Sequence, residues 1–229
     1  MSQAPHPADR TARALRRVMT MHPLRPAKPA DKEAVVDVLS RAFHQDPVVN
    51  FIVRSDEQRA SGLRAFFGMS FALRDLSHGE VMTSDGYRGA MLWMPSEGVH
   101  AGLVDRIRVT PEFVRCVGVF RVAKMLRFFT KVEHAHPREP HVYVQFIGID
   151  PASRGSGLAY AYLQHAIQIA DACSRPIYAE TSNSDNLPIW AKAGLIESGV
   201  LNFGDGAPKI WQLRRPVSGA RAIRSGEQV

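Results

Sequence analysis

The chain has 229 residues, of which 45% are hydrophobic and 22% are charged, the composition of an ordinary globular domain. No apolar run approaches the roughly 20 residues of a membrane-spanning helix, so no membrane association is expected. The formal net charge of +7 is carried by the two ends, because residues 29–213 hold 19 Lys and Arg against 20 Asp and Glu. The charge therefore predicts weak, unspecific anion binding and no specific nucleic-acid partner.

One domain is expected over residues 23–215, with a flexible basic leader at 1–22 and a flexible tail at 216–229. The leader is Arg-rich and acid-poor, as organellar transit peptides are, but a plain leader on a cytoplasmic protein is the favoured interpretation. Cys116 and Cys173 lie in separate apolar segments without metal-binding or redox spacing. Both are expected to be reduced core residues, and no metal site is predicted.

Hydrophobic periodicity defines the elements of the first half of the chain. In order, these are a short edge strand at 22–26, a helix capped by Asp31, a loop at 44–53, a helix from Glu57 to Asp75, and a hairpin of strands 79–85 and 87–96 that turns at Asp85 and Gly86. A helical pattern follows from Ala101 to Val132, with Phe120 on its apolar side and Arg121, Lys124, Arg127 and Lys131 on a solvated basic face.

The second half alternates strands and helices. The expected elements are a strand buried on both faces at 141–150, a helix from about Ser156 to Ala172, a central strand at 176–182, a short helix closed by Gly194, and an antiparallel pair of strands at 197–203 and 209–215. This order predicts an α/β fold built on one sheet with mixed strand directions.

The stretch "IDPASRGSGLAYAYL", residues 149–163, joins the end of a strand to the start of a helix. A helix N-terminus presents unpaired N–H groups and a partial positive charge, so it binds anions, most often phosphate. Gly155 and Gly157 remove side chains that would keep a pyrophosphate from the backbone, and Arg154 adds a charged donor. The stretch therefore predicts a pyrophosphate site.

Arg154-x-x-Gly157-x-Ala159 resembles the R/Q-x-x-G-x-G/A motif that binds the acetyl-CoA pyrophosphate in the GNAT acetyltransferase superfamily. A second block, in which a strand leads to Asn186 and a short helix ends at Gly194, is similar to the block that lines the pantetheine arm there. The stretches "AFHQDPVVNFI", "GAMLWMPSEG" and "YAETSNSDN" resemble the puromycin N-acetyltransferase-like branch.

This resemblance implies a mixed, largely antiparallel twisted sheet of about seven strands, with the central fourth and fifth strands splayed and a helical insert between the third and fourth. It implies acetyl-CoA as cosubstrate, bound between the splayed strands. The backbone at Phe146, Ile147 and Ile149 would bind the pantetheine amides, with Gly148 allowing a β-bulge. The amide of Ile147 or of a neighbouring residue would polarise the acetyl carbonyl. The residues expected at the pyrophosphate are Arg154, Gly155, Ser156, Gly157, Leu158 and Ala159, and Asn186, which could equally be a helix N-cap, would hold the arm near the thiol.

The catalytic residues are less clear from the resemblance. Trp190 stands where the family usually places a tyrosine as general acid, and an indole N–H donates a hydrogen bond but does not usefully release a proton. Either the thiolate leaves unprotonated, or Tyr160 or Tyr178 serves, or the protein binds acetyl-CoA with little catalysis. Glu180 is the favoured general base, because it lies near the end of the fifth strand. The alternatives are His141, Asp46 and Glu97.

The function expected from this reasoning is acetyl-CoA-dependent N-acetyltransfer to a primary amine of a small molecule, an antibiotic or a metabolite, by direct attack on the thioester. Two alternatives stay open: a non-catalytic acyl-CoA-binding or regulatory module, suggested by Trp190, and a protein or aminoacyl-tRNA acetyltransferase, suggested by the basic ends and the helical insert. The protein is expected to be a monomer or a homodimer.

Overall fold

The computed structural model describes residues 22–74, 77–99, 111–204 and 206–217. These residues form one seven-stranded sheet with the strand order β1-β2-β3-β4-β5-β7-β6. The strands are β1 (Leu24–Pro26), β2 (Glu80–Ser84), β3 (Gly89–Pro95), β4 (Val142–Ile149), β5 (Ile177–Thr181), β6 (Ile196–Leu201) and β7 (Ile210–Arg215). All neighbours are antiparallel except β4 and β5, which are parallel, so the predicted mixed, largely antiparallel sheet is confirmed.

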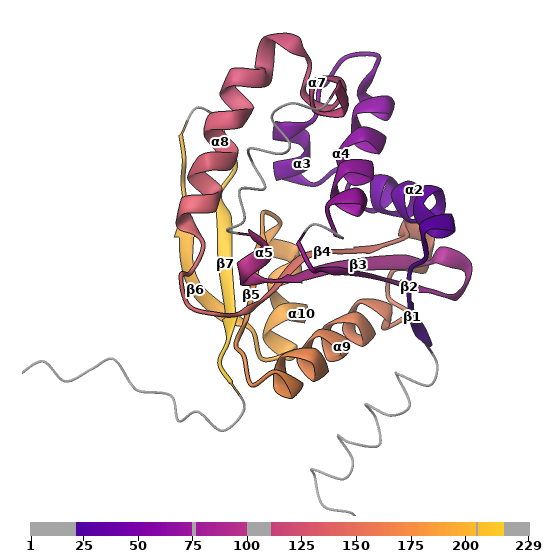
Figure 1. The fold of residues 1–229 in the computed structure, drawn as a ribbon, viewed down its shortest axis with the longest axis vertical. Helices are drawn as coiled ribbons and strands as arrows, with labels where there is room; N and C mark the ends of the chain where they lie inside the picture. Colours follow the sequence, from indigo (N-terminus) through magenta and orange to yellow (C-terminus); the bar gives the residue numbers. More distant parts are fainter. Residues whose placement is uncertain (1–21, 75–76, 100–110, 205, 218–229) are drawn as a thin grey trace, which may run out of the picture.

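Helices cover both faces of the sheet (Figure 1). The α-helices are α2 (Lys32–Ala42), α3 (Pro47–Ile52), α4 (Arg59–Leu73), α5 (Ser96–Val99), α7 (Pro111–Val117), α8 (Val122–Ala135), α9 (Leu158–Ala172) and α10 (Leu187–Lys192). Single 3-10 turns are η1 (Pro29–Asp31), η2 (Asp85–Tyr87), η3 (Val119–Arg121), η4 (Pro151–Ser153) and η5 (Ser184–Asn186). Helices α2, α3, α4, α7 and α8 bury one apolar cluster against one face, and α9 and α10 bury a second cluster against the other.

The prediction of a loop at 44–53 is wrong, because α3 forms there. Asp46 precedes the helix in an extended conformation, its side chain accepts a hydrogen bond from the Val49 amide, and Pro47 occupies the first helical turn. A side chain that accepts a backbone hydrogen bond, followed by proline, favours the start of a helix, because the fixed φ of proline suits the first turn. The Asp46-Pro47 pair therefore indicated a helix start, although the apolar run after it has no clear helical periodicity.

The continuous helical pattern expected from Ala101 to Val132 is broken within its described part. Gly118 has φ 81°, so α7 ends there and α8 starts after η3; residues 101–110 lie outside the described residues. The break leaves Phe120, expected on an apolar face, 99% exposed. It also turns Arg121 away from a solvated face, because its guanidinium donates to the backbone carbonyls of Phe51 and Val53 and ties α8 to α3.

Three further expectations are corrected. Asp31 does not cap α2 with its side chain; its carboxylate binds Arg25, the Tyr87 hydroxyl and the Lys28 amide, and so joins β1 to η2. Cys116 is buried as predicted, whereas Cys173 is exposed at the end of α9. The expected double-sided burial of 141–150 fails in the middle of β4, where the strand faces a cavity rather than a packed helix.

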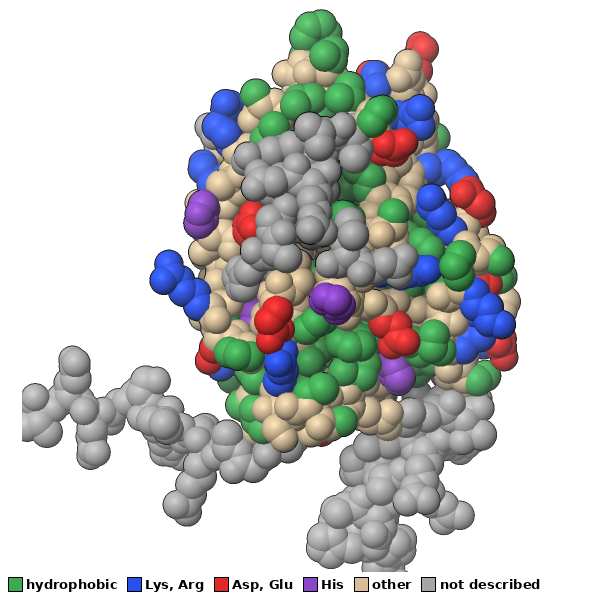
Figure 2. All heavy atoms as spheres, in the orientation of Figure 1, with side chains coloured by type: hydrophobic (Ala, Val, Ile, Leu, Met, Phe, Trp, Pro, Cys, Tyr) green, Lys and Arg blue, Asp and Glu red, His purple; other side chains and the backbone are tan. Residues whose placement is uncertain are grey.

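The predicted leader and tail fall outside the described residues except for His22, Pro216 and Val217. Among the residues that the structure does describe, no helix has both the length and the apolarity needed to cross a membrane. On the face drawn in Figure 2, Lys and Arg side chains lie interspersed with Asp and Glu rather than in one continuous basic patch.

Candidate active site

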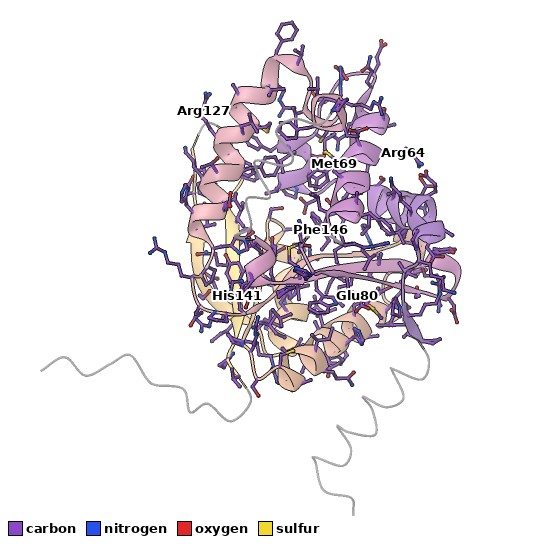
Figure 3. All side chains as sticks on the ribbon, in the orientation of Figure 1. Arg64, Met69, Glu80, Arg127, His141 and Phe146 are labelled. Carbon is purple, nitrogen blue, oxygen red and sulfur yellow. The ribbon has the colours of Figure 1, made fainter. Side chains whose placement is uncertain are left out.

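Strands β4 and β5 separate along their length, as predicted. They pair only over Val142–Val144 and Ile177–Ala179, so the backbone of β4 from Gln145 onward has no partner in β5. A cavity of about 210 Å³ lies at this separation, between the sheet and helices α3, α4 and α8. Figure 3 shows Phe146 of β4 and Met69 of α4 on facing sides of this space. The separation of two central strands therefore opens the interior of the fold to a ligand.

A β-bulge in β4 determines which side chains reach the cavity. Leu92 pairs with Phe146 and Trp93 with Val144, so Gln145 is the extra residue on β4. A bulge places two successive side chains on one face of a sheet. Gln145 and Phe146 accordingly both line the cavity.

The bulge was expected at Gly148, and this is wrong. A Cβ atom on Gly148 would lie 2.7 Å from Leu39 Cδ2 and 2.9 Å from a ring carbon of Phe43. Gly148 therefore allows α2 to pack closely on β4, which is a structural role.

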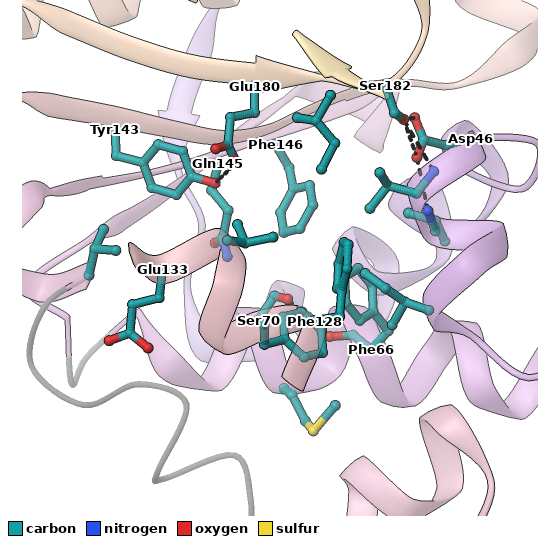
Figure 4. A pocket seen from close by; sticks show the side chains of 18 of the residues that line it. Asp46, Phe66, Ser70, Phe128, Glu133, Tyr143, Gln145, Phe146, Glu180 and Ser182 are labelled. Carbon is teal, nitrogen blue, oxygen red and sulfur yellow. Dashed lines mark hydrogen bonds between the residues drawn. The ribbon is translucent and has the colours of Figure 1, made fainter. Parts of the chain in front are cut away.

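Glu180 lies on β5 at the edge of the cavity with its side chain 11% exposed. It accepts a hydrogen bond from the Tyr143 hydroxyl (3.4 Å; Figure 4) and one from the Tyr178 hydroxyl (2.8 Å). His136 Nε2 lies 3.9 Å from its Oε1. Burial in an apolar surrounding raises the pKa of Glu180 to about 7, although the two tyrosine hydroxyls oppose this shift by stabilising the carboxylate. A carboxyl group with this pKa can accept and release a proton near neutral pH.

A second carboxylate reaches the cavity from the opposite side. Asp46 accepts hydrogen bonds from the Ser182 hydroxyl (3.0 and 3.1 Å) and from the Val49 amide, so it joins the start of α3 to the chain after β5 (Figure 4). Burial raises its pKa, and these hydrogen bonds act against the shift. Asp46 is thus held in place by the fold and adds a second carboxyl group to the cavity wall.

The 154–159 loop has the conformation that an anion site needs. Gly155 (φ 78°) and Gly157 (φ 89°) are both left-handed, and no heavy atom lies within 4 Å of a Cβ built on Gly155. The first helical bond of α9 runs from the Ala161 amide to the Gly157 carbonyl, so the amides of Ala159 and Gly157 have no backbone acceptor within the described ranges. The residues present therefore fit a pyrophosphate group.

Two neighbours hold this loop. His22 Nε2 donates to the Ser156 carbonyl at 2.8 Å, and the Arg154 guanidinium donates to the Ala42 carbonyl at 3.3 Å. Neither contact uses an amide of the loop. The amides of Arg154, Ser156 and Leu158 donate within the segment at 3.4 Å, to the Pro151 carbonyl, the Ser153 carbonyl and the Ser156 hydroxyl. The Arg154 guanidinium lies on the surface, where it can also reach an anion.

The structure does not bring all predicted site residues to the cavity. Trp190 is buried among the apolar side chains on the α9 face, and the Ile147 side chain packs against the same cluster. Asn186 is exposed and its side chain does not cap α10; Asn183 caps η5 instead. These three residues do not line the cavity.

The alternative acids and bases also lie elsewhere. Glu97 pairs with Arg175 at 2.8 Å, and this ion pair lowers the pKa of Glu97 to about 2. The His141 ring binds the Glu139 carbonyl and packs against the ring of Tyr178. Lys192 covers the ring of Tyr160 on the α9 face. Only Asp46 and Glu180 of the predicted acids and bases line the cavity.

Sequence reasoning missed Tyr143, Gln145 and Ser182. A weak signal existed for Gln145, since it is the only polar uncharged side chain inside an otherwise apolar and aromatic strand. Tyr143 and Ser182 act through partners on other elements, and no local pattern indicates such pairs.

The family model described as the acetyltransferase (GNAT) family matches residues 75–194, which is more than half of the chain. The chain belongs to the GNAT family. It is therefore an acetyltransferase, and acetyl-CoA is the acetyl donor that this family uses. The predicted superfamily is confirmed.

Solved structures of GNAT proteins share the fold. The histone acetyltransferase HPA2 and related acetyltransferase from Corynebacterium glutamicum is 22% identical, with a TM-score of 0.65 over 86% of this chain and 97% of that one. The ribosomal-protein-S18-alanine N-acetyltransferase of Escherichia coli is 14% identical, with a TM-score of 0.51 over 89% and 98%. The mosquito protein named arylalkylamine N-acetyltransferase like 5b is 15% identical, with a TM-score of 0.52 over 85% of this chain and 99% of that one. At these identities the likeness extends to the fold alone.

Proposed function

We propose that this GNAT enzyme transfers the acetyl group of acetyl-CoA to the primary amine of a small molecule, with Glu180 as general base. The observation that carries the proposal is the position of Glu180: a buried carboxyl group with a pKa of about 7, at the cavity where β4 and β5 separate. The resemblance to the puromycin N-acetyltransferase-like branch supports a small-molecule acceptor. The modest cavity supports it too, because a polypeptide or a tRNA would need an open surface.

The donor site in this proposal consists of backbone. Amides of the 154–159 loop would hold the pyrophosphate, because they converge at the start of α9 with glycines at the close approach. The edge of β4 that has no partner in β5, at Ile147 and Ile149, would bind the pantetheine amides, and the Ile147 amide would donate to the acetyl oxygen. Phe146 was also predicted here, but it pairs with Leu92 of β3. Bound acetyl-CoA supplies an activated thioester carbonyl.

Side chains of this protein would accept the proton that the amine releases. Ionised Glu180 takes a proton from the amine, directly or through a water molecule, while Tyr143 and Tyr178 fix the orientation of the carboxylate. The two hydroxyls also limit the rise of the Glu180 pKa, which keeps part of the population ionised at pH 7. Because Trp190 is part of the apolar core, we propose that the thiolate leaves without a proton from this residue.

Calorimetric titration with acetyl-CoA tests the donor site. Wild type is expected to bind, and Gly157→Glu is expected to abolish binding, because its side chain and charge would occupy the phosphate position. Glu197→Gln on the exposed edge strand serves as the control. Thiol release with a panel of primary amines then tests transfer, and a folded wild type that binds no acetyl-CoA would overturn the proposal.

A further inference from the structure

The cavity wall is apolar over most of its area, and its other side chains are neutral polar groups, carboxyl groups and one histidine, His136. Five phenylalanines line it: Phe66, Phe113, Phe128, Phe129 and Phe146. Of the residues that the structure describes, three with acidic side chains line it, Asp46, Glu133 and Glu180, and no Lys or Arg does. A wall of this composition favours an amine on an apolar body and repels a substrate carboxylate or phosphate.

The size of the cavity limits that body. Its volume is about 210 Å³. Small-molecule sites commonly measure about 300–1,000 Å³, and a dry apolar cavity of about 150 Å³ accepts benzene. One ring or a short alkyl chain together with an amino group therefore fills the space.

One polar group in the cavity lacks a partner. Gln145 Oε1 is buried, and it has no hydrogen-bond partner among the described residues. The bulge in β4 turns this side chain into the cavity, on the same side of the strand as Tyr143 (Figure 4). A buried amide oxygen without a donor is costly, so this position is suited to a ligand that supplies an N–H group.

We propose that the acceptor is a primary amine on a compact apolar body, which fills the phenylalanine-lined cavity while its nitrogen donates a hydrogen bond to Gln145 Oε1. This inference rests on the proposed function and adds the substrate class and a specificity residue. One N–H of the amine binds Gln145 and Glu180 takes the other proton. The C–N bond forms as the C–S bond breaks, and the thiolate of coenzyme A leaves.

A series of amines, assayed with the wild-type protein, tests whether the acceptor site prefers a compact apolar body. From ethylamine to pentylamine, kcat/KM for thiol release is expected to rise about fourfold per methylene, the transfer free energy of one buried CH₂. Benzylamine is expected to exceed phenylglycine by about a hundredfold, because phenylglycine adds a carboxylate that would be buried without a partner. No rise with chain length, or phenylglycine equal to benzylamine, would overturn the inference.

Gln145→Met tests the hydrogen bond, since methionine keeps the length of the side chain and removes its acceptor. We expect kcat/KM for benzylamine to fall about tenfold while the dissociation constant of acetyl-CoA stays within twofold. Gln164→Met, on α9 at the other face of the sheet, is the matched control. An unchanged kcat/KM in a folded Gln145→Met variant refutes the role of Gln145, and if the variant does not fold, the wild-type amine series still decides the substrate class.

The two proposals fail in different ways. Absence of acetyl-CoA binding, or of thiol release with every amine, overturns the proposed function. Acetylation of hydrophilic amines in preference to apolar ones leaves the proposed function standing and overturns only this inference.

Discussion

The buried carboxyl group of Glu180 makes the stability of the protein depend on pH. The folded-state pKa of about 7 lies above the ordinary value of 4.5, so between these pH values the folded state binds more protons than the unfolded state. Stability is therefore lost as pH rises through this window. Because one pKa unit corresponds to about 1.4 kcal/mol, the ionised carboxylate costs the fold about 3 kcal/mol above pH 8.

Glu180→Gln removes this cost and keeps a side chain of the same shape that still accepts from Tyr178. Relative to wild type, the variant should gain about 2–3 kcal/mol in unfolding free energy between pH 5 and pH 8. Urea unfolding followed by circular dichroism at both pH values measures this difference. Glu197→Gln, an exposed glutamate on β6, is the control for loss of a carboxylate. If the wild-type and Glu180→Gln stabilities change in parallel with pH, Glu180 does not titrate near 7 and the assignment of the base loses its basis.

The remaining predictions concern activity, packing and capping. The kcat of the wild type, measured by thiol release, should rise with pH through an apparent pKa of about 7. Glu180→Gln should lower kcat by about a hundredfold or more and remove this rise. If the rise with pH persists in the variant, the general base is another group. Gly148→Ala should lower the unfolding free energy by about 1–3 kcal/mol, because the new Cβ meets Leu39 and Phe43. Gly68→Ala, in open space on α4, should raise it by about 1 kcal/mol in the same urea titration. Equal effects of the two substitutions would contradict the packing role of Gly148. Asp46→Ala should cost about 1 kcal/mol through loss of the α3 cap, with Asp46→Asn close to wild type, and equal losses in thermal unfolding would show that the cap is not the cause.

Local chemistry made the conformation of the proposed donor loop predictable. The conformation of the 154–159 loop follows from two glycines before an amphipathic helix, because only glycine adopts positive φ without strain. The alternation of strands and helices likewise followed from periodicity, since burial of one face repeats every two residues in a strand and every 3.6 in a helix. Glu180 was predicted from its position near the end of a central strand.

The acceptor side was decided by the tertiary structure. The bulge at Gln145 exists because β3 and β4 shift register between Leu92 and Trp93, and a register is a property of two strands that residues 96–141 separate in the chain. In the same way, the raised pKa of Glu180 depends on its burial in the folded protein, and the position of Asp46 depends on Ser182. By itself the sequence determined the family and the fold, and it indicated the backbone site that we propose for the donor, because these depend on short-range pattern. Which side chains meet around the acceptor was decided only by folding, since contacts between distant elements determine their burial, charge and direction.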